Sequence, residues 1–295
     1  MGTTVTITVV AASEPAAGPA LDAAFAEVAA MERMFSSYRT DSDLSRLNAL
    51  AGQGPQPVPA PFAELVAAAR DTAALTGGAF NPMLGPAIKL WGIPENPAVP
   101  DAAALDALRP LLDPAGITVD VAGARVTLAR PGMALGLGGI AKGFTADRVQ
   151  ALLRGMGVGA GIVAVAGDIR VWGTRPDGTP WRIGVRDPDG GHKPRARLAL
   201  TAGAVSTSGD YERFFELDGV RYHHILDPRT LFPARGVRSV TVLAPTGTRA
   251  DGLATALFVM GVADGLALVE TLPGVEALYI AENGAVTTSA GWPGT

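Results

Sequence analysis

The hydrophobic positions of this chain follow two periods, and the period changes along its length. In the first third, apolar residues recur three or four apart over residues 21–34 and, after Pro61, over residues 62–69. This spacing places them on one face of a helix, so both stretches are predicted to be helical. Residues 1–10 instead alternate polar and apolar side chains, which predicts a strand.

Short strands are predicted for much of the remaining chain. A hairpin is expected over residues 117–128 with its turn at 122–124, and helices at 145–153, 249–260 and 263–272. Further strands are predicted at residues 162–165, 169–173, 181–185, 198–201, 204–208, 237–243 and 275–280. This order indicates an α+β fold with a mostly antiparallel sheet. The proline-rich residues 94–100 are the best linker candidate, but residues 1–295 are expected to form one unit.

Composition excludes several classes of protein and of site. With 295 residues and 48% hydrophobic content, the chain can bury a sizeable core. A formal net charge of −4 leaves no basic surface for nucleic acid. The absence of cysteine excludes disulfides, thiolate metal sites and a cysteine nucleophile. No uncharged apolar run reaches the roughly 18–20 residues that span a bilayer, so no membrane span is predicted.

Residues 135–148, with the sequence LGLGGIAKGFTADR, are the most informative stretch for chemistry. Four glycines surround Lys142, one of only three lysines, just before the predicted helix at 145–153. Backbone N–H groups at a helix start, beside an ammonium group, form an anion site. A turn that leads into a helix and carries a solvent-facing lysine would give the same pattern.

Two known phosphate-binding patterns do not fit this segment. Gly136, Gly138 and Ala141 have the spacing of a dinucleotide-binding loop, but residues 133–137 make a poor strand and no acid lies near position 160. A P-loop lysine directly follows a glycine and precedes Ser or Thr, whereas Lys142 lies between Ala141 and Gly143.

Asp251 and Thr255 form a second candidate group, because a spacing of four places a carboxylate and a hydroxyl on one helix face. Such an oxygen pair suits Mg²⁺, which completes its octahedron with a carbonyl, waters and phosphate oxygens. Two local explanations stay open. Asp251 can interact with the helix dipole, and Thr255 can bond within its own helix.

Two of the three histidines, His223 and His224, are adjacent. On a strand they would point to opposite faces, so at most one is expected in a site. A near-neutral pKa makes such a histidine usable as a base, although a packed or hydrogen-bonded histidine is the more common case.

Nine short motifs, in order along nearly the whole chain, resemble those of the ApbE family, the FAD:protein FMN transferases. No single motif is diagnostic, but their order and compatible spacing are. They are residues 1–3, 35–42 with 47–48, 77–82, 138–147, 166–169, 181–184, 207–209, 224–228, and 250–251 with Thr255.

The resemblance implies a T-fold-related α+β unit, with a mostly antiparallel sheet flanked by helices, an FAD cleft and Mg²⁺ at the pyrophosphate. It implies that a Thr or Ser hydroxyl of an acceptor flavoprotein attacks the riboflavin-side phosphorus of FAD. FMN then stays attached to the acceptor, and AMP leaves. Hydrolysis of FAD to FMN and AMP, and flavin binding without chemistry, are the alternatives.

Matching positions imply a role for each site residue. Mg²⁺ would be held by Asp251, Thr255 and the carbonyl of Gly139, while Lys142 would neutralise phosphate or organise the site. The attacking hydroxyl would be deprotonated or oriented by His224, supported by Asp227. The FAD site would be lined by Met1, Tyr38, Ala79, Phe80, Asn81, Gly136, Lys142 and Ile225.

The chain departs from the family pattern at four positions. Gly136 replaces an acid expected to contact flavin, and Asn81 stands where Asp is common. Ala254 replaces an acid seen in some members, and Leu231 replaces a common glycine. We expect FAD binding to survive these changes, with effects on specificity and metal affinity.

The lipoprotein cysteine of many secreted family members is also absent, and the chain as written is therefore expected to be cytoplasmic. A trimmed N-terminal segment would instead make the protein exported or membrane-anchored.

Overall fold

A seven-stranded sheet forms the centre of the computed structural model, which describes residues 3–191 and 193–294. Every neighbouring pair of its strands is antiparallel. The strands, in spatial order, are β1 (Val5–Val10), β5 (Ala160–Val165), β6 (Asp168–Trp172), β9 (Ala202–Gly209), β12 (Val237–Ala244), β13 (Glu276–Ala281) and β14 (Val286–Thr288). With the helices around it, this sheet confirms the predicted α+β class.

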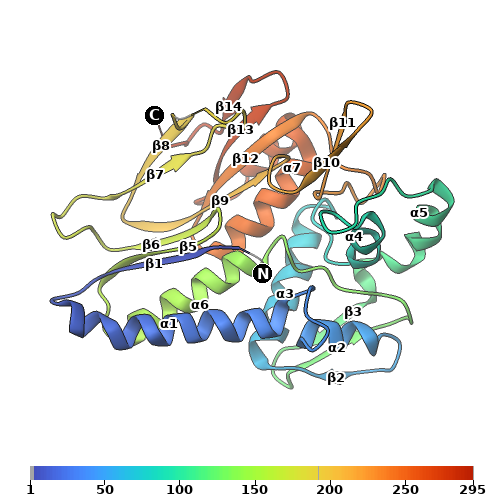
Figure 1. Ribbon diagram of the computed structural model, residues 1–295, viewed down its shortest axis with the longest axis horizontal. Helices are drawn as coiled ribbons and strands as arrows, with labels where there is room; N and C mark the ends of the chain where they lie inside the picture. The colour runs from blue at the N-terminus through green and yellow to red at the C-terminus, as the bar shows by residue number, and fades with distance from the viewer. Residues whose placement is uncertain (1–2, 192, 295) are drawn as a thin grey trace.

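Helices cover one face of the sheet. Helix α6 (Ala141–Gly155) packs on β5 and β6, and α7 (Gly247–Val269) packs on β9 and β12. Helix α1 (Glu14–Phe35) lies beside α6, as Figure 1 shows in blue and light green. Side chains of β5 alternate between buried and partly buried positions, because one face of the strand meets these helices.

The opposite face of the sheet is covered by a hairpin of β7 (Trp181–Val185) and β8 (Ala196–Leu200). Both strands alternate strictly between buried and exposed side chains. Their buried residues Trp181, Ile183 and Leu198 pack with Val171 and Val205 of the large sheet. The period-two pattern that predicted these strands therefore reflects a single buried face.

The rest of the chain forms a second layer next to α7. It contains α3 (Ala60–Leu75), which contacts α7, and a small sheet in the order β2 (Gln56–Pro57), β4 (Arg125–Leu128), β3 (Ile117–Asp120). Three short helices complete it: α2 (Asp43–Ala49), α4 (Gly85–Trp91) and α5 (Ala102–Leu108). Two 3₁₀ turns, Arg109–Leu111 and Pro114–Gly116, precede β3, and a separate hairpin joins β10 (Phe214–Leu217) to β11 (Val220–His223).

Most elements expected from the sequence are present, with small shifts of their ends. The strand predicted at 1–10 is β1, which begins at Val5, and the hairpin at 117–128 is β3–β4. The proline-rich residues 94–100 lie in the loop between α4 and α5. The short elements α2, α4, α5, β2, β10, β11 and β14 were not expected.

Helix α7 is the most apolar helix-length segment and contains an internal break. Gly261 has φ 79° and ψ 178°, so two helical segments meet there, as predicted for 249–260 and 263–272. Within the described residues, α7 is the one helix with the length and hydropathy of a membrane span. Leu253, Leu257 and Phe258 are fully buried, and packing in the core accounts for this apolar composition.

Helices α6 and α7 touch backbone to backbone at Gly143 and Gly247. A Cβ atom at either position would overlap the carbonyl oxygen of the other. Asp147 strengthens the same contact, since its carboxylate accepts hydrogen bonds from the backbone N–H groups of Gly247 (2.7 Å) and Thr248 (2.8 Å) at the start of α7. The two helix starts are therefore held together.

Candidate active site

Gly139 and Thr255 meet where the loop before α6 approaches α7. The Thr255 hydroxyl lies 3.3 Å from the carbonyl oxygen of Gly139 and donates to it. A Cβ atom at position 139 would lie 2.6 Å from that hydroxyl oxygen, so only glycine fits without displacement. Two of the three predicted metal-binding oxygens are thus adjacent, although they come from residues 116 positions apart.

Asp251 lies one turn before Thr255 and is 2% exposed. Its Oδ2 atom accepts a hydrogen bond from the backbone N–H of Gly143, at 3.0 Å. The Lys142 Nζ atom lies 3.3 Å and 3.4 Å from its two oxygens. The carboxylate, the hydroxyl, the Gly139 carbonyl and the ammonium group therefore share one location.

Asp168 is a further member of this site that the sequence prediction of site residues did not include. Its Oδ2 atom lies 2.6 Å from Lys142 Nζ, and its Oδ1 atom accepts a hydrogen bond from the Ser206 hydroxyl. A two-residue turn after β5 makes Asp168 the first residue of β6. The motif at 166–169 contained the signal, but the pairing with Lys142 depends on the fold.

Burial and like charge dominate the electrostatics of the site. Burial, followed by the charge of Asp168, raises the pKa of Asp251 to about 7, against the opposing effect of Lys142. Burial also acts to lower the pKa of Lys142, but the two carboxylates outweigh it and raise that pKa above its ordinary value. Two carboxylates face one ammonium group, so a further cation would be attracted here.

The donor set suits a hard cation such as Mg²⁺. Within residues 3–191 and 193–294, no three His, Asp or Glu side chains gather into a metal cage. The site offers one carboxylate, one hydroxyl and one carbonyl, all oxygen donors, and Mg²⁺ commonly combines few protein oxygens with waters and substrate phosphates. The Thr255 hydroxyl and Gly139 carbonyl oxygens, only 3.3 Å apart, are close enough for one cation to contact both.

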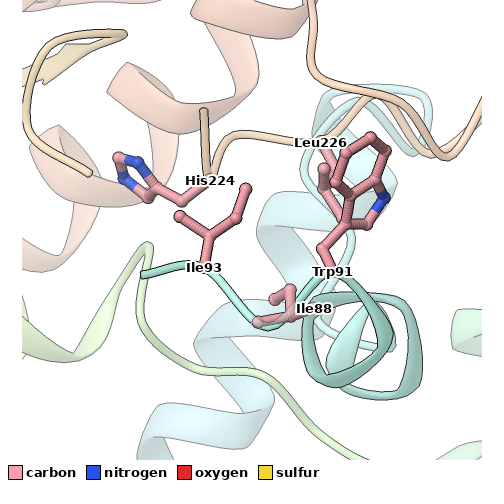
Figure 2. Close-up of a pocket in the computed structure, with 5 residues that line it drawn as sticks. All are labelled: Ile88, Trp91, Ile93, His224 and Leu226. Carbon is pink, nitrogen blue, oxygen red and sulfur yellow. The ribbon is translucent and has the colours of Figure 1, made fainter. Parts of the chain in front are cut away.

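His224 follows β11 and lies partly buried beside an apolar recess. Figure 2 shows its imidazole next to Ile93, with Trp91 and Leu226 farther along the recess. The Nδ1 atom lies 3.1 Å from the carbonyl oxygen of Arg213, which can only accept, so Nδ1 carries the proton and Nε2 the lone pair. Burial lowers the pKa of His224 to about 4, and the nearby charges of Arg213 and Lys142 add to this effect.

The two adjacent histidines have different environments, as expected. His223 is 1% exposed, and its Nε2 atom lies 2.8 Å from the carbonyl oxygen of Ala234. Its ring packs against Phe258 with a centroid distance of 5.4 Å. Burial lowers its pKa as well. His223 is thus part of the core, whereas His224 is only partly buried.

Asp227 and Ile225 lie in the segment that follows His224, but their side chains interact with groups other than this histidine. The Asp227 carboxylate accepts hydrogen bonds from the Arg229 guanidinium, the shortest at 2.8 Å, and from the Arg229 backbone N–H. Its hydrogen bonds therefore stabilise the turn at 227–229 and do not join it to His224. Ile225 is buried with Ala234 and Val237, and partly buried Ala79 packs against the same cluster.

Tyr38 is half exposed and pairs with Arg213. The Arg213 guanidinium donates a hydrogen bond to the Tyr38 hydroxyl and lies 5.6 Å from the centre of its ring. Because the carbonyl of Arg213 also holds His224, this arginine links the predicted flavin-binding tyrosine to the predicted base.

The predicted flavin strip at Ala79, Phe80 and Asn81 lies next to Gly136. The backbone N–H of Gly136 donates to the carbonyl of Pro82 at 2.7 Å. Phe80 is buried in the core, and the Asn81 side chain bonds to the backbone of Leu112 and Met83. Met1, the remaining residue predicted for the FAD site, lies outside the described residues.

The structure shows the surroundings of three of the four departures from the family pattern. A Cβ atom at Gly136 would lie 3.3 Å from the backbone N of Gly85, so an acid there requires this loop to shift. Ala254 is fully buried in the α7 core, where an acid would be desolvated. Leu231 has φ 62°, the left-handed conformation that glycine adopts without strain.

Comparisons with known proteins identify the family to which this chain is similar. A family model described as the ApbE family matches residues 1–279. The FAD:protein FMN transferase of Treponema pallidum is 43% identical over 289 residues, covering 92% of this chain and 80% of that protein.

Solved structures are similar over nearly the whole chain. The crystal structure of the ApbE protein from Thermotoga maritima has 36% identity and a TM-score of 0.90, and the match covers 98% of this chain and 94% of that chain. The apo flavinyl transferase ApbE of Pseudomonas stutzeri has 36% identity and a TM-score of 0.87, with coverage of 98% and 92%. The chain described here therefore belongs to the ApbE family.

Proposed function

We propose that this protein transfers the FMN moiety of FAD to a Thr or Ser hydroxyl of an acceptor flavoprotein, in a Mg²⁺-dependent reaction that releases AMP. The observation that carries the proposal is the convergence of Asp251, Thr255 and the Gly139 carbonyl beside Lys142. Oxygen donors next to an ammonium group suit a pyrophosphate substrate that arrives with a divalent cation.

The proposed step is a phosphoryl-group transfer. The acceptor hydroxyl oxygen forms a bond to the riboflavin-side phosphorus of FAD, and the bond from that phosphorus to the bridging oxygen of AMP breaks. The hydroxyl proton passes to a base, and AMP leaves with the bridging oxygen. Such a reaction depends mainly on alignment and charge neutralisation.

Residues of this chain supply both requirements. When bound by Asp251, Thr255 and the Gly139 carbonyl, Mg²⁺ would neutralise charge on the pyrophosphate oxygens. The Lys142 ammonium group keeps its proton throughout the physiological range, because the neighbouring carboxylates raise its pKa. It can therefore donate a hydrogen bond to a phosphate oxygen.

His224 is proposed as the base. Its lowered pKa keeps the ring neutral above about pH 4, and the hydrogen bond from Nδ1 to Arg213 leaves the Nε2 lone pair to accept the hydroxyl proton. Arg213 fixes the ring orientation through the same bond. Asp227 contributes indirectly, since its pairing with Arg229 fixes the loop that follows His224.

A direct test compares three outcomes that all begin with FAD binding. The purified chain is incubated with FAD and Mg²⁺, together with a flavoprotein acceptor or with the same acceptor whose target Thr or Ser is changed to Ala. Flavin fluorescence on the unmodified acceptor in a denaturing gel supports transfer. AMP release without labelled acceptor supports hydrolysis, and intact FAD in every tube leaves only flavin binding.

Asp251→Asn tests the role of the metal-binding carboxylate. The amide has nearly the same size but no charge, so transfer should fall by on the order of a hundredfold or more. Affinity for FAD without Mg²⁺, measured by quenching of flavin fluorescence, should change little. Wild-type turnover by Asp251→Asn would contradict the metal assignment.

A further inference from the structure

We infer that Asp168 is a positioning residue: it holds the Lys142 ammonium group and so leaves the Asp251 carboxylate available to a divalent cation. The inference rests on the proposed Mg²⁺ site and adds to it a residue that does not bind the metal. The juxtaposition that carries it is one ammonium group between two buried carboxylates.

The ammonium group is shared unequally. Lys142 Nζ lies 2.6 Å from Asp168 Oδ2 but 3.3 Å and 3.4 Å from the oxygens of Asp251. Charge-assisted N–H···O bonds are typically about 2.7–2.9 Å long. Lys142 is therefore bound tightly by Asp168 and only loosely by Asp251.

Asp168 is itself fixed by rigid elements. It is 3% exposed, begins β6, and accepts a hydrogen bond from Ser206 in the middle of the neighbouring strand β9. The two strands are paired directly at Ile169 and Val205. Lys142, by contrast, has a long flexible side chain on the first turn of α6. A fixed carboxylate thus determines where a mobile cation rests.

The position of Lys142 matters because it is the nearest competitor for Asp251. If Asp168 no longer held the ammonium group, Lys142 would close on Asp251 and form a short ion pair there. A divalent cation would then have to displace a protein ammonium group from its own ligand. Partners that orient groups around a metal site commonly affect metal affinity about 10- to 100-fold.

Ser206→Ala is the sharpest test, because it loosens Asp168 without changing any charge. Binding of Mg²⁺ to the full chain, without FAD, is measured by isothermal titration calorimetry. We expect Ser206→Ala to weaken Mg²⁺ binding by about fivefold, the effect of one hydrogen bond. Asp168→Glu, which keeps the charge but moves the carboxylate, should weaken it further.

The coupling to Lys142 distinguishes positioning from direct action. In a Lys142→Met background the competitor is gone, so adding Ser206→Ala should leave Mg²⁺ affinity unchanged. An equal loss in both backgrounds would mean that Asp168 acts on the cation directly, and this overturns the inference. Equal affinity of the wild type, Ser206→Ala and Asp168→Glu overturns it as well.

Ser239→Ala provides a matched control. Ser239 lies on β12 and is fully buried, and its hydroxyl has no hydrogen-bond partner in the described part of the chain. Its removal should change neither Mg²⁺ affinity nor the circular dichroism spectrum. If the wild type shows no saturable Mg²⁺ binding, the proposed metal site fails, and this inference fails with it. Normal wild-type binding with an unaffected Ser206→Ala variant rejects the inference alone.

Discussion

Individual residues at the site differ mainly in how completely they are buried and in which charges face them. Asp251 and Asp168 are 2% and 3% exposed, whereas the Lys142 side chain remains 27% exposed. Lys142, held most closely by Asp168, therefore still meets solvent, whereas both carboxylates are buried between the packed sheet and helices.

The lowered pKa of His224 predicts a dependence of stability on pH. The ordinary pKa is 6.5 and the folded value about 4, so the unfolded chain binds a proton between these values that the folded chain does not. Folding stability should therefore fall as the pH falls from about 6.5 to about 4. The groups facing this ring are His223, Arg213 and Lys142.

His224→Gln should remove part of this loss of folding stability. The part removed between pH 7 and pH 4 should be at most about 3 kcal/mol. Urea unfolding of both proteins at several pH values measures it. Because His223 also has a lowered pKa, some pH dependence should persist in the variant. If the free energy of unfolding depends on pH equally in the two proteins, His224 does not titrate in this way.

Leu231 gives a second prediction at this scale. It is fully buried but has φ 62°, and a non-glycine residue in this conformation is strained by roughly 1 kcal/mol. Leu231→Ala and Leu231→Gly both lose buried surface, but only Gly relieves the strain. We expect Leu231→Gly to be at least as stable as Leu231→Ala in urea unfolding.

The control is Leu65, fully buried in the ordinary helix α3. There Gly should be less stable than Ala by about 1 kcal/mol, the usual order. If Leu231→Ala were likewise more stable than Leu231→Gly, backbone strain at this position would be contradicted.

Sequence spacing predicted the site only where local geometry was sufficient. Asp251 and Thr255 share a helix face, so a spacing of four was enough to bring them together. Asp168 reaches Lys142 through the pairing of distant strands, and Arg213 reaches Tyr38 across 175 positions of the chain. Asp227 was predicted to support His224, but its carboxylate binds Arg229, which is only two residues away in the sequence.

Secondary structure elements differ in how far their own sequence determines them. Long segments such as α1, α3 and the strands of the main sheet other than β14 were predictable from their hydrophobic patterns. The short helices α2 and α5 depend instead on the capping side chains of Ser42 and Asp101 and on contacts with the rest of the fold. A helix of seven residues is too short for its hydrophobic period to be recognised in the sequence.

The break in α7 leads to a prediction about this element. A Cβ atom at Gly261 would meet nothing within 4 Å, yet φ 79° with ψ 178° is a conformation almost restricted to glycine. Gly261→Ala should therefore lower the free energy of unfolding by about 1–3 kcal/mol, without any steric clash.

Gly18 in α1 is the matched position, with equally open space and helical backbone. Gly18→Ala should stabilise the protein by about 0.5–1 kcal/mol, because alanine favours helix. Thermal unfolding should therefore give a lower Tm than wild type for Gly261→Ala and a higher Tm for Gly18→Ala. Stabilisation by both substitutions would show that α7 is continuous in solution.

At the scale of the whole molecule, the candidate site joins segments from every part of the chain. Its residues come from α6, α7, β6 and the loop after β11, with Tyr38 and the strip at 79–81 from the N-terminal third. A ligand that touches all of them would connect the sheet layer with the α3 layer. Binding should therefore stabilise the entire fold.

Ligand-dependent melting tests this expectation. With ligand at about a hundred times its dissociation constant, stability rises by about 2.7 kcal/mol, which raises Tm by several degrees. FAD with Mg²⁺ should raise Tm more than FAD alone, and Asp251→Asn should lose only the increment due to Mg²⁺. Identical melting curves with and without Mg²⁺ in the wild type would count against a shared site.

The contact between Gly143 and Gly247 also bears on how this protein can evolve. Neither glycine offers a side chain to a ligand, yet a single added methyl group at either one would push apart the helices that carry Lys142 and Asp251. We expect these two glycines to tolerate almost no replacement in any descendant that keeps its activity, and a library of variants at both positions, selected for transfer, should return glycine.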